Sequence, residues 1–370
     1  MAGIVASRTI GSMRLDPTPH LLIPFAACDA ESWLPAMQSL APGSLKNLGA
    51  LLQGMRPAHR DAGAAESLSP PHERALARAL GLATPETPDG LLPWAAHEAA
   101  ALPASAGSAW AWITPCHWAM GHLHATLSDP AQLGLDAGAS RALLALMQPY
   151  FETDGLTLHY VDALGPGRWL AEGGLLRGLP TASLDRVLGR NVDAWLPGAR
   201  PAERSAGPTQ ASSAPAGGSA LHEVKSVGAK TLTRLQNEMQ MLLYTHPFND
   251  AREASRLLPV NSFWISGTGD LPALDAGAKA GDAAAPVSAP RTLAQAVLRE
   301  DWAGYAQAWA ALDAGDIAAL LARQRAGDSV RLTLCGESSA QAFETHRAGL
   351  WQRVTSLFSP QPPLDVLKQL

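Results

Sequence analysis

LQNEMQMLLYTHPFNDAREASRLLPVNSFWISGTG, residues 235–269, is the stretch that decides the fold of this chain. Leu235, Met239 and Leu243 recur at the spacing of one helical face. Pro247 disfavours the helical conformation before it, so that helix is expected to end near residue 245. Asp250, with Glu253 three residues later, predicts a capped second helix over 251–257. Residues 260–266 then alternate as a strand and end at a Gly-Thr-Gly turn.

The same alternation of helix and strand extends over the rest of the chain. Alternating or continuous apolar runs predict strands, and a Gly-Pro-Gly turn joins two of them into a hairpin. These strands are expected at 20–27, 108–115, 156–161, 168–172 and 329–335. Helical stripes are expected at 45–55, 70–82, 136–151, 292–324 with a break at 313–315, and 343–358. The pattern predicts an α/β or mixed α+β fold, with a central mixed sheet and flanking helices.

Low-complexity segments divide the chain. Residues 1–18 are expected to be a flexible N-terminus, and 198–220, rich in Gly, Pro, Ser and Ala, a disordered loop. An N-terminal α/β part is then expected at 19–197. A C-terminal α/β part at 221–370 is expected to complete the same core, with a flexible loop at 271–290.

Composition narrows the class of protein. Of the 370 residues, 47% are hydrophobic and 16% charged, which is enough for a packed core. The net charge of −5 argues against direct nucleic-acid binding, which draws on clustered Lys and Arg. No run approaches the ~20 apolar residues of a membrane span. The chain has three cysteines that lie far apart in sequence, Cys28, Cys116 and Cys335. This pattern does not suggest a disulfide framework and favours a reducing, cytoplasmic location.

Residues 235–269 also carry polar side chains beside chain reversals. Glycines at the end of a strand allow backbone amides to approach a ligand, and Arg and His side chains bind anions. We therefore expect a small polar or anionic ligand to bind at His246, Asn249, Arg252, Asn261, Gly267 and Gly269. The alternative is structural: the histidine caps a helix, the asparagines satisfy turn backbones, the arginine pairs with a neighbouring carboxylate, and the glycines turn the chain.

The pattern HP.N..R, PVNSFW and GTG over residues 246–269 resembles RpfE-type regulatory proteins of proteobacteria, often labelled phosphoglycerate mutase-like. The resemblance extends to residues 169–170, 189–191 and 237–240. Within the block alone, the pattern is also similar to archaeal-type cofactor-independent phosphoglycerate mutases. The resemblance implies an α/β core related to the alkaline-phosphatase superfamily, in degenerate form.

The chain departs from a working mutase, which the resemblance implies would use a Ser or Thr nucleophile and two divalent metals. The first expected strand runs into Cys28-Asp29 with a single carboxylate, and no metal motif follows Cys335. We predict no cofactor and no metal site; a divalent metal would have only the weak candidates Asp29, His117, His124 and Glu337.

These features predict a non-catalytic or weakly catalytic regulatory protein that binds a small polar or anionic ligand or a protein partner. One alternative is a metal-dependent, phosphoglycerate mutase-like phosphotransferase or phosphatase. Another is a scaffold that binds a protein through an apolar, tryptophan-bearing surface.

Overall fold

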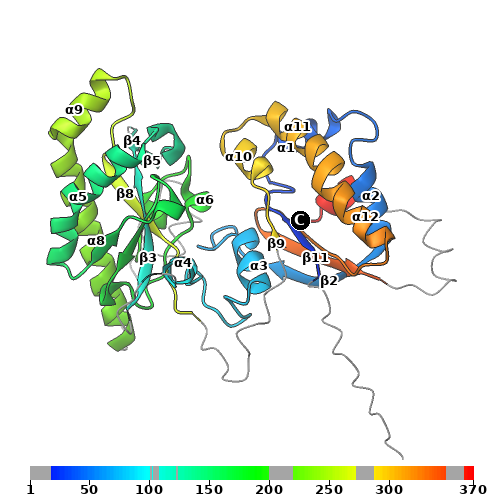
Figure 1. The fold of residues 1–370 in the computed structure, drawn as a ribbon, viewed down its shortest axis with the longest axis horizontal. Coiled ribbons are helices and arrows are strands. Elements are labelled where there is room, and N and C mark those ends of the chain that lie inside the picture. Colours follow the sequence, from blue (N-terminus) through cyan, green and yellow to red (C-terminus); the bar gives the residue numbers. More distant parts are fainter. Residues whose placement is uncertain are drawn as a thin grey trace, which may run out of the picture.

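The chain folds into two lobes, each built on its own β-sheet (Figure 1). The computed structural model describes residues 18–100, 102, 108–121, 124–199, 220–271, 287–346 and 362–370. We call the lobe formed by residues 18–82 and 287–370 the terminal lobe, and the lobe formed by residues 90–271 the inserted lobe. The inserted lobe therefore lies between two segments of the terminal lobe in sequence.

The terminal lobe contains a five-stranded mixed sheet. Its strands, in spatial order, are β2 (Met55–Ala62), β11 (Ser339–Thr345), β10 (Arg331–Cys335), β1 (His20–Ile23) and β9 (Val287–Ser288). β1 runs parallel to both of its neighbours, β10 and β9, whereas the pairs β10–β11 and β11–β2 are antiparallel. The N-terminal strand thus lies between two strands that come from the last 84 residues of the chain.

Helices cover both faces of this sheet. Leu21 and Ile23 point into the larger cluster of buried side chains, and Leu22 points to the opposite face, against α3 (Pro71–Ala79). This alternation is what a strand buried on both faces requires. The helices of the larger cluster are α1 (Trp33–Gln38), α2 (Lys46–Gln53), α10 (Thr292–Leu298), α11 (Trp302–Leu312), α12 (Ala318–Arg325) and α14 (Pro363–Leu367).

A π-helical turn, Asp313–Ile317, joins α11 to α12 where the sequence predicts a break. It places the buried Asp313 against the N-terminus of α2, where its carboxylate accepts hydrogen bonds from the backbone N–H groups of Asn47 (3.1 Å) and Leu48 (2.8 Å). The first N–H groups of a helix have no partner within the helix. A residue 265 positions away therefore caps α2.

The inserted lobe contains a four-stranded antiparallel sheet, in the order β6 (Thr157–His159), β7 (Trp169–Glu172), β3 (Trp110–Cys116) and β8 (Ser262–Ser266). One face, which includes Ile113 and Ile265, packs on α5 (Ala137–Thr153) and α8 (Ala220–Tyr244). The other face carries Trp112, Thr114 and Ser266 toward the terminal lobe.

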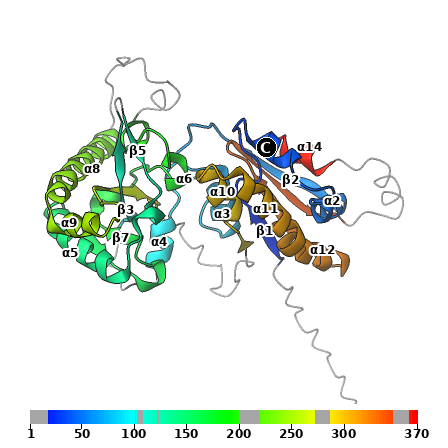
Figure 2. The same cartoon turned by 90° about the horizontal axis from the view of Figure 1, so that it is seen from above.

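The remaining elements of the inserted lobe lie around this sheet, as Figure 2 shows from above. They are α4 (Trp94–Ala99), α6 (Leu184–Val187), α9 (Pro247–Ala254), the hairpin β4 (Trp118–Met120) and β5 (Ala125–Leu127), and the 3-10 turns Pro130–Leu133, Asp162–Leu164, Gly174–Leu176 and Asp193–Trp195.

The predicted fold class is confirmed: a mixed sheet with flanking helices is present, and the hairpin at 156–172 forms between β6 and β7. Three predicted helical segments differ from the structure. The segment 292–324 is interrupted between α10 and α11, and not at the predicted break at 313–315, where the π-helical turn continues the helix. The helix at 343–358 is wrong at its start, because Phe343 pairs with Leu332 in the sheet, and 347–361 lie outside the described residues. The helix at 251–257 instead begins at Pro247, a residue that suits the first helical position.

Each predicted part of the chain, 19–197 and 221–370, contributes strands to both sheets, and the two sheets have separate clusters of buried side chains. The segments predicted to be flexible, 1–18, 198–220 and 271–290, lie mostly outside the described residues. Over the residues that are described, no helix is long and apolar enough to cross a membrane.

Candidate functional site

Asn249 and Arg252, predicted as ligand-binding residues, lie buried at a corner of the inserted lobe. The Asn249 amide donates to the carbonyls of Leu243 (2.8 Å) and Val260 (2.7 Å) and accepts from the N–H of Val260 (2.9 Å). The Arg252 guanidinium donates to the carbonyls of Leu258 and Leu133. Both side chains therefore bind backbone groups that would otherwise lack partners.

The other predicted ligand residues divide between two places. His246 caps α9 by accepting from the N–H of Phe248 (3.1 Å), and Asn261 binds both backbone groups of Trp118. Gly269, with φ +148°, lies against the carbonyl of Leu91, where no side chain would fit. Gly267, in contrast, lines a cavity between the lobes. The structure thus does not bring the six residues together around one ligand-sized space, and their ligand role stays a prediction.

The four weak metal candidates also lie apart. The backbone N–H of Asp29 meets the Glu337 carboxylate (3.4 Å) in the terminal lobe, whereas His117 binds the carbonyl of Pro259 (2.9 Å) in the inserted lobe. His124 is exposed. None of them belongs to a group of three or more potential ligands within the described part of the chain.

A cavity with a volume of about 370 Å³ lies between the two lobes. The terminal lobe contributes the end of β1, α3 and the segment after β9. The inserted lobe contributes α4, the start of α6 and the polar face of β3 and β8. Apolar walls come from Leu22, Leu76, Leu92 and Trp94. Cavities of this kind, mainly apolar with a few placed polar groups, are typical of small-molecule sites.

A charged cluster joins the lobes at one wall of this cavity. Buried Asp185, on α6, accepts from His72 Nε2 (3.0 Å) on α3 and from Arg291 Nη2 at both carboxylate oxygens (2.7 and 2.8 Å). Burial by itself would raise the pKa of Asp185, but the His72 hydrogen bond and the Arg291 charge hold it well below its usual range. Asp185 is therefore an ionised carboxylate shared between the lobes.

Glu73 and Ser183 form a second contact between the lobes at the same wall. The Ser183 hydroxyl donates to the Glu73 carboxylate (2.5 Å) and accepts from the N–H of Asp185 at the start of α6. Burial raises the pKa of Glu73, and the negative charge of Asp185 raises it further. Burial thus works against the ionised form of Glu73, whereas the partners of Asp185 stabilise its ionised form.

Arg168, which precedes β7, also lines the cavity. Its guanidinium lies over the Trp112 ring, 4.1 Å from the ring centroid, and 3.9 Å from the Glu98 carboxylate. Trp112 in turn stacks against Trp94, with 6.4 Å between centroids. Burial lowers the pKa of Arg168. Among the described residues, no hydrogen bond reaches this guanidinium, which leaves its N–H groups available to the cavity.

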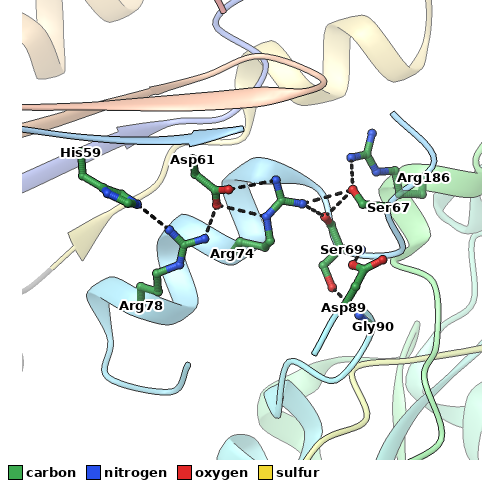
Figure 3. A network of polar contacts seen from close by, with 9 residues as sticks. All are labelled: His59, Asp61, Ser67, Ser69, Arg74, Arg78, Asp89, Gly90 and Arg186. Carbon is green, nitrogen blue, oxygen red and sulfur yellow. Dashed lines mark hydrogen bonds and ion pairs between the residues drawn. The ribbon is translucent and has the colours of Figure 1, made fainter. Parts of the chain in front are cut away.

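A polar network beside the cavity holds the lobes together (Figure 3). The buried Arg186, on α6, donates to the Ser67 hydroxyl (2.9 Å) and to the Glu337 carbonyl (3.0 Å) of the terminal lobe. Ser67 also accepts from Arg74, which pairs with Asp61 (3.0 Å) at the end of β2. Burial, with the charges of other arginines, lowers the pKa of Arg186 to about 10. The network fixes α6, and hence Asp185, against the terminal lobe.

His72, Glu73 and Asp185 bring their ligand atoms within 4.8 Å of one another, the arrangement a metal ion requires. The donor set does not fit a metal well. Arg291 and His72 already occupy the Asp185 oxygens, and Ser183 occupies Glu73. In this geometry the Arg291 guanidinium supplies the positive charge that a metal ion would otherwise bring to Asp185.

Apart from Gly267, the sequence analysis did not predict the residues of this site. Arg168 stands at the start of a predicted hairpin strand, and Ser183 and Asp185 lie in a short segment without clear periodicity. The only local signal was Ser183-x-Asp185, typical of a helix cap, which by itself indicates structure and not chemistry.

No family model matches this chain, and no curated protein matches it. Two solved structures align over most of its length. The PH0037 protein from Pyrococcus horikoshii is 11% identical over 92% of this chain and 93% of its own, with a TM-score of 0.39. The cofactor-independent phosphoglycerate mutase from Thermoplasma acidophilum is 13% identical over 96% and 99%, with a TM-score of 0.31. At these scores neither structure assigns an activity.

Proposed function

We propose that this protein binds a small organic anion in the interlobe cavity, with Arg168 and Arg291 as the anion-binding residues. The observation that carries the proposal is the Arg168 guanidinium, which lies in the cavity wall without a hydrogen bond to any described residue. Arg291 lies in the same cavity and binds Asp185 through Nη2 alone, so its remaining N–H groups are also available.

The physical argument is one of unmet hydrogen bonding. A partly buried guanidinium loses solvation, and burial lowers the pKa of Arg168 for that reason. A carboxylate or phosphate would restore charge-assisted hydrogen bonds, each contributing about 1.5–3 kcal/mol. The stack on Trp112 holds the guanidinium plane in place before the ligand arrives, which reduces the entropy lost on binding.

In this proposal the protein is a cytoplasmic regulator that senses a metabolite-sized acid. The proposal includes that the protein is related to RpfE-type regulators and, through its fold, to the alkaline-phosphatase superfamily.

A second candidate, a phosphotransferase or phosphatase, is favoured by one observation. The Ser183 hydroxyl donates to the carboxylate of Glu73, which is the arrangement of a nucleophile beside a potential base. An enzyme of this kind would hydrolyse p-nitrophenyl phosphate and lose that activity on Ser183→Ala. Absence of turnover in the wild-type protein removes this candidate.

The test of the first candidate uses inorganic phosphate and acetate as probes, with thermal unfolding and titration calorimetry as readouts. A ligand at 100 times its Kd stabilises the folded state by about 2.7 kcal/mol, which is a shift of several degrees. We expect Arg168→Ala to abolish the shift. Arg141→Ala is the matched control, because Arg141 also lies over an aromatic ring, Tyr160 (4.2 Å), but outside the cavity. A shift that survives Arg168→Ala contradicts the proposal.

A further inference from the structure

The floor of the interlobe cavity carries two hydroxyl groups that nothing in the described protein satisfies. Thr114 on β3 and Ser266 on β8 are 5% and 4% exposed, and both line the cavity. Neither hydroxyl makes a hydrogen bond to a described residue. Ser266 pairs with Trp112 across the two strands, so Thr114 lies diagonally from it on the same face.

Unsatisfied hydroxyls at a buried site are uncommon. Most buried polar side chains have a partner, and one left without a partner costs about 1–3 kcal/mol. Other buried hydroxyls of this lobe have protein partners: Thr181 binds Thr268 (2.8 Å), and Ser140 binds the carbonyl of Pro166 (2.7 Å). Ser262 Oγ also has no partner, but Ser262 does not line the cavity. The hydroxyls of Thr114 and Ser266 are unpartnered and face the cavity. A wholly apolar occupant would leave them unpaired.

We propose that the ligand is a hydroxylated acid, of the sugar-acid or sugar-phosphate type, and that Thr114 and Ser266 are its specificity-determining residues. This inference rests on the proposed function, because Arg168 and Arg291 take the acidic group. The hydroxyls of the ligand body then bind Thr114 and Ser266 on the floor. The C–H faces of the body pack against Trp94 and the leucine walls.

The size of the cavity agrees with this class of ligand. About 370 Å³ lies at the lower end of the range of small-molecule sites. Arg168 and Arg291 line the same cavity as the two hydroxyls of the sheet. A five- or six-carbon chain with one acidic end therefore suits the space better than an inorganic ion, which would reach the guanidiniums and leave the floor unpaired.

The experiment compares acids that differ only in their hydroxyl groups. Titration calorimetry measures gluconate against hexanoate, and ribose 5-phosphate against pentyl phosphate, with inorganic phosphate as the anion alone. The two pairs distinguish a carboxylate from a phosphate ligand. The protein variants are Thr114→Val and Ser266→Ala. Thr157→Val, an exposed threonine on β6 of the same sheet, is the control.

We expect the hydroxylated member of at least one pair to bind ten times tighter or more than its alkyl analogue. A site built to bind a hydroxyl rejects a ligand that lacks it, because its own polar groups are left unpaired. Thr114→Val and Ser266→Ala should each reduce that preference about tenfold, and Thr157→Val should not. None of the three should change the affinity for inorganic phosphate.

The outcomes separate the two proposals. If the alkyl acids bind as tightly as the hydroxylated ones, and both depend on Arg168, the hydroxylated-acid inference is wrong and the anion site stands. The inference is also wrong if the preference survives both floor variants. If no acid and no phosphate binds, the proposed function fails, and this inference fails with it.

Discussion

Replacing Arg252 by alanine decides between the structural and the ligand-binding interpretation of residues 246–261. The structure has the Arg252 guanidinium donating to the carbonyls of Leu258 (2.8 and 2.9 Å) and Leu133, with 5% of the residue exposed. These bonds tie the end of α9 and the turn before β8 to the 3-10 turn Pro130–Leu133. We therefore expect Arg252→Ala to destabilise the inserted lobe.

The magnitude follows from the two carbonyls left without partners. Each costs about 1–3 kcal/mol when buried. Leu133 is 1% exposed, so the cost of leaving its carbonyl unpaired lies near the upper end of this range. Leu258 is partly exposed, so the cost for its carbonyl lies near the lower end. The expected loss is about 3–4 kcal/mol in the free energy of unfolding. Arg252→Lys keeps the charge and one hydrogen bond, and should cost about half as much.

Urea unfolding followed by tryptophan fluorescence measures the loss, and hydrogen exchange of peptides over residues 243–261 locates it. Glu253→Ala, one position along α9 and exposed, is the control and should change stability by less than about 0.5 kcal/mol. If Arg252→Ala is as stable as this control and phosphate no longer stabilises it, the structural reasoning is refuted and the ligand role holds.

Two further predictions concern the terminal lobe. Burial, and then the charge of Arg331, lower the pKa of His20 to about 4. The unfolded chain therefore takes up a proton at a higher pH than the folded protein does. About 3 kcal/mol of the free energy of unfolding that is present above pH 6.5 should be lost between pH 6.5 and pH 4. His20→Gln should flatten this part of the unfolding-versus-pH curve; an unchanged curve contradicts the assignment. Asp313→Ala should lower stability by about 2 kcal/mol in urea unfolding, since α2 loses its cap, whereas the exposed Asp316→Ala should have little effect. Equal losses in both aspartate variants would show that the cap is unimportant.

Much of the fold could be predicted from short-range patterns. The strands at His20–Ile23 and Arg331–Cys335 and the hairpin of β6 and β7 were predictable because alternation and turn residues are local signals. Strand β2 was not predictable, because its segment Met55–Ala62 is largely exposed and polar. It is the edge strand of the sheet and pairs with β11 alone. Its conformation depends on β11, more than 270 residues away.

The candidate site was less predictable than the fold. The stretch at 246–261 attracted attention because it concentrates polar side chains, yet these side chains bind backbone groups of the inserted lobe. Arg168 and Arg291, in contrast, lie 123 positions apart and carry no local pattern. What brings them into one cavity is the packing of two lobes, which no spacing along the chain records.

The position of β1 between β9 and β10 has a consequence for the order in which the chain folds. All segments of the inserted lobe, residues 90–271, are synthesised before either neighbour of β1. The inserted lobe is therefore expected to fold first, as domains do during synthesis. Until residues 287–335 follow, the apolar run of His20–Ile23 has no strand to pair with and must wait as exposed, aggregation-prone chain. We therefore expect chaperones to bind the N-terminal segment of the nascent chain.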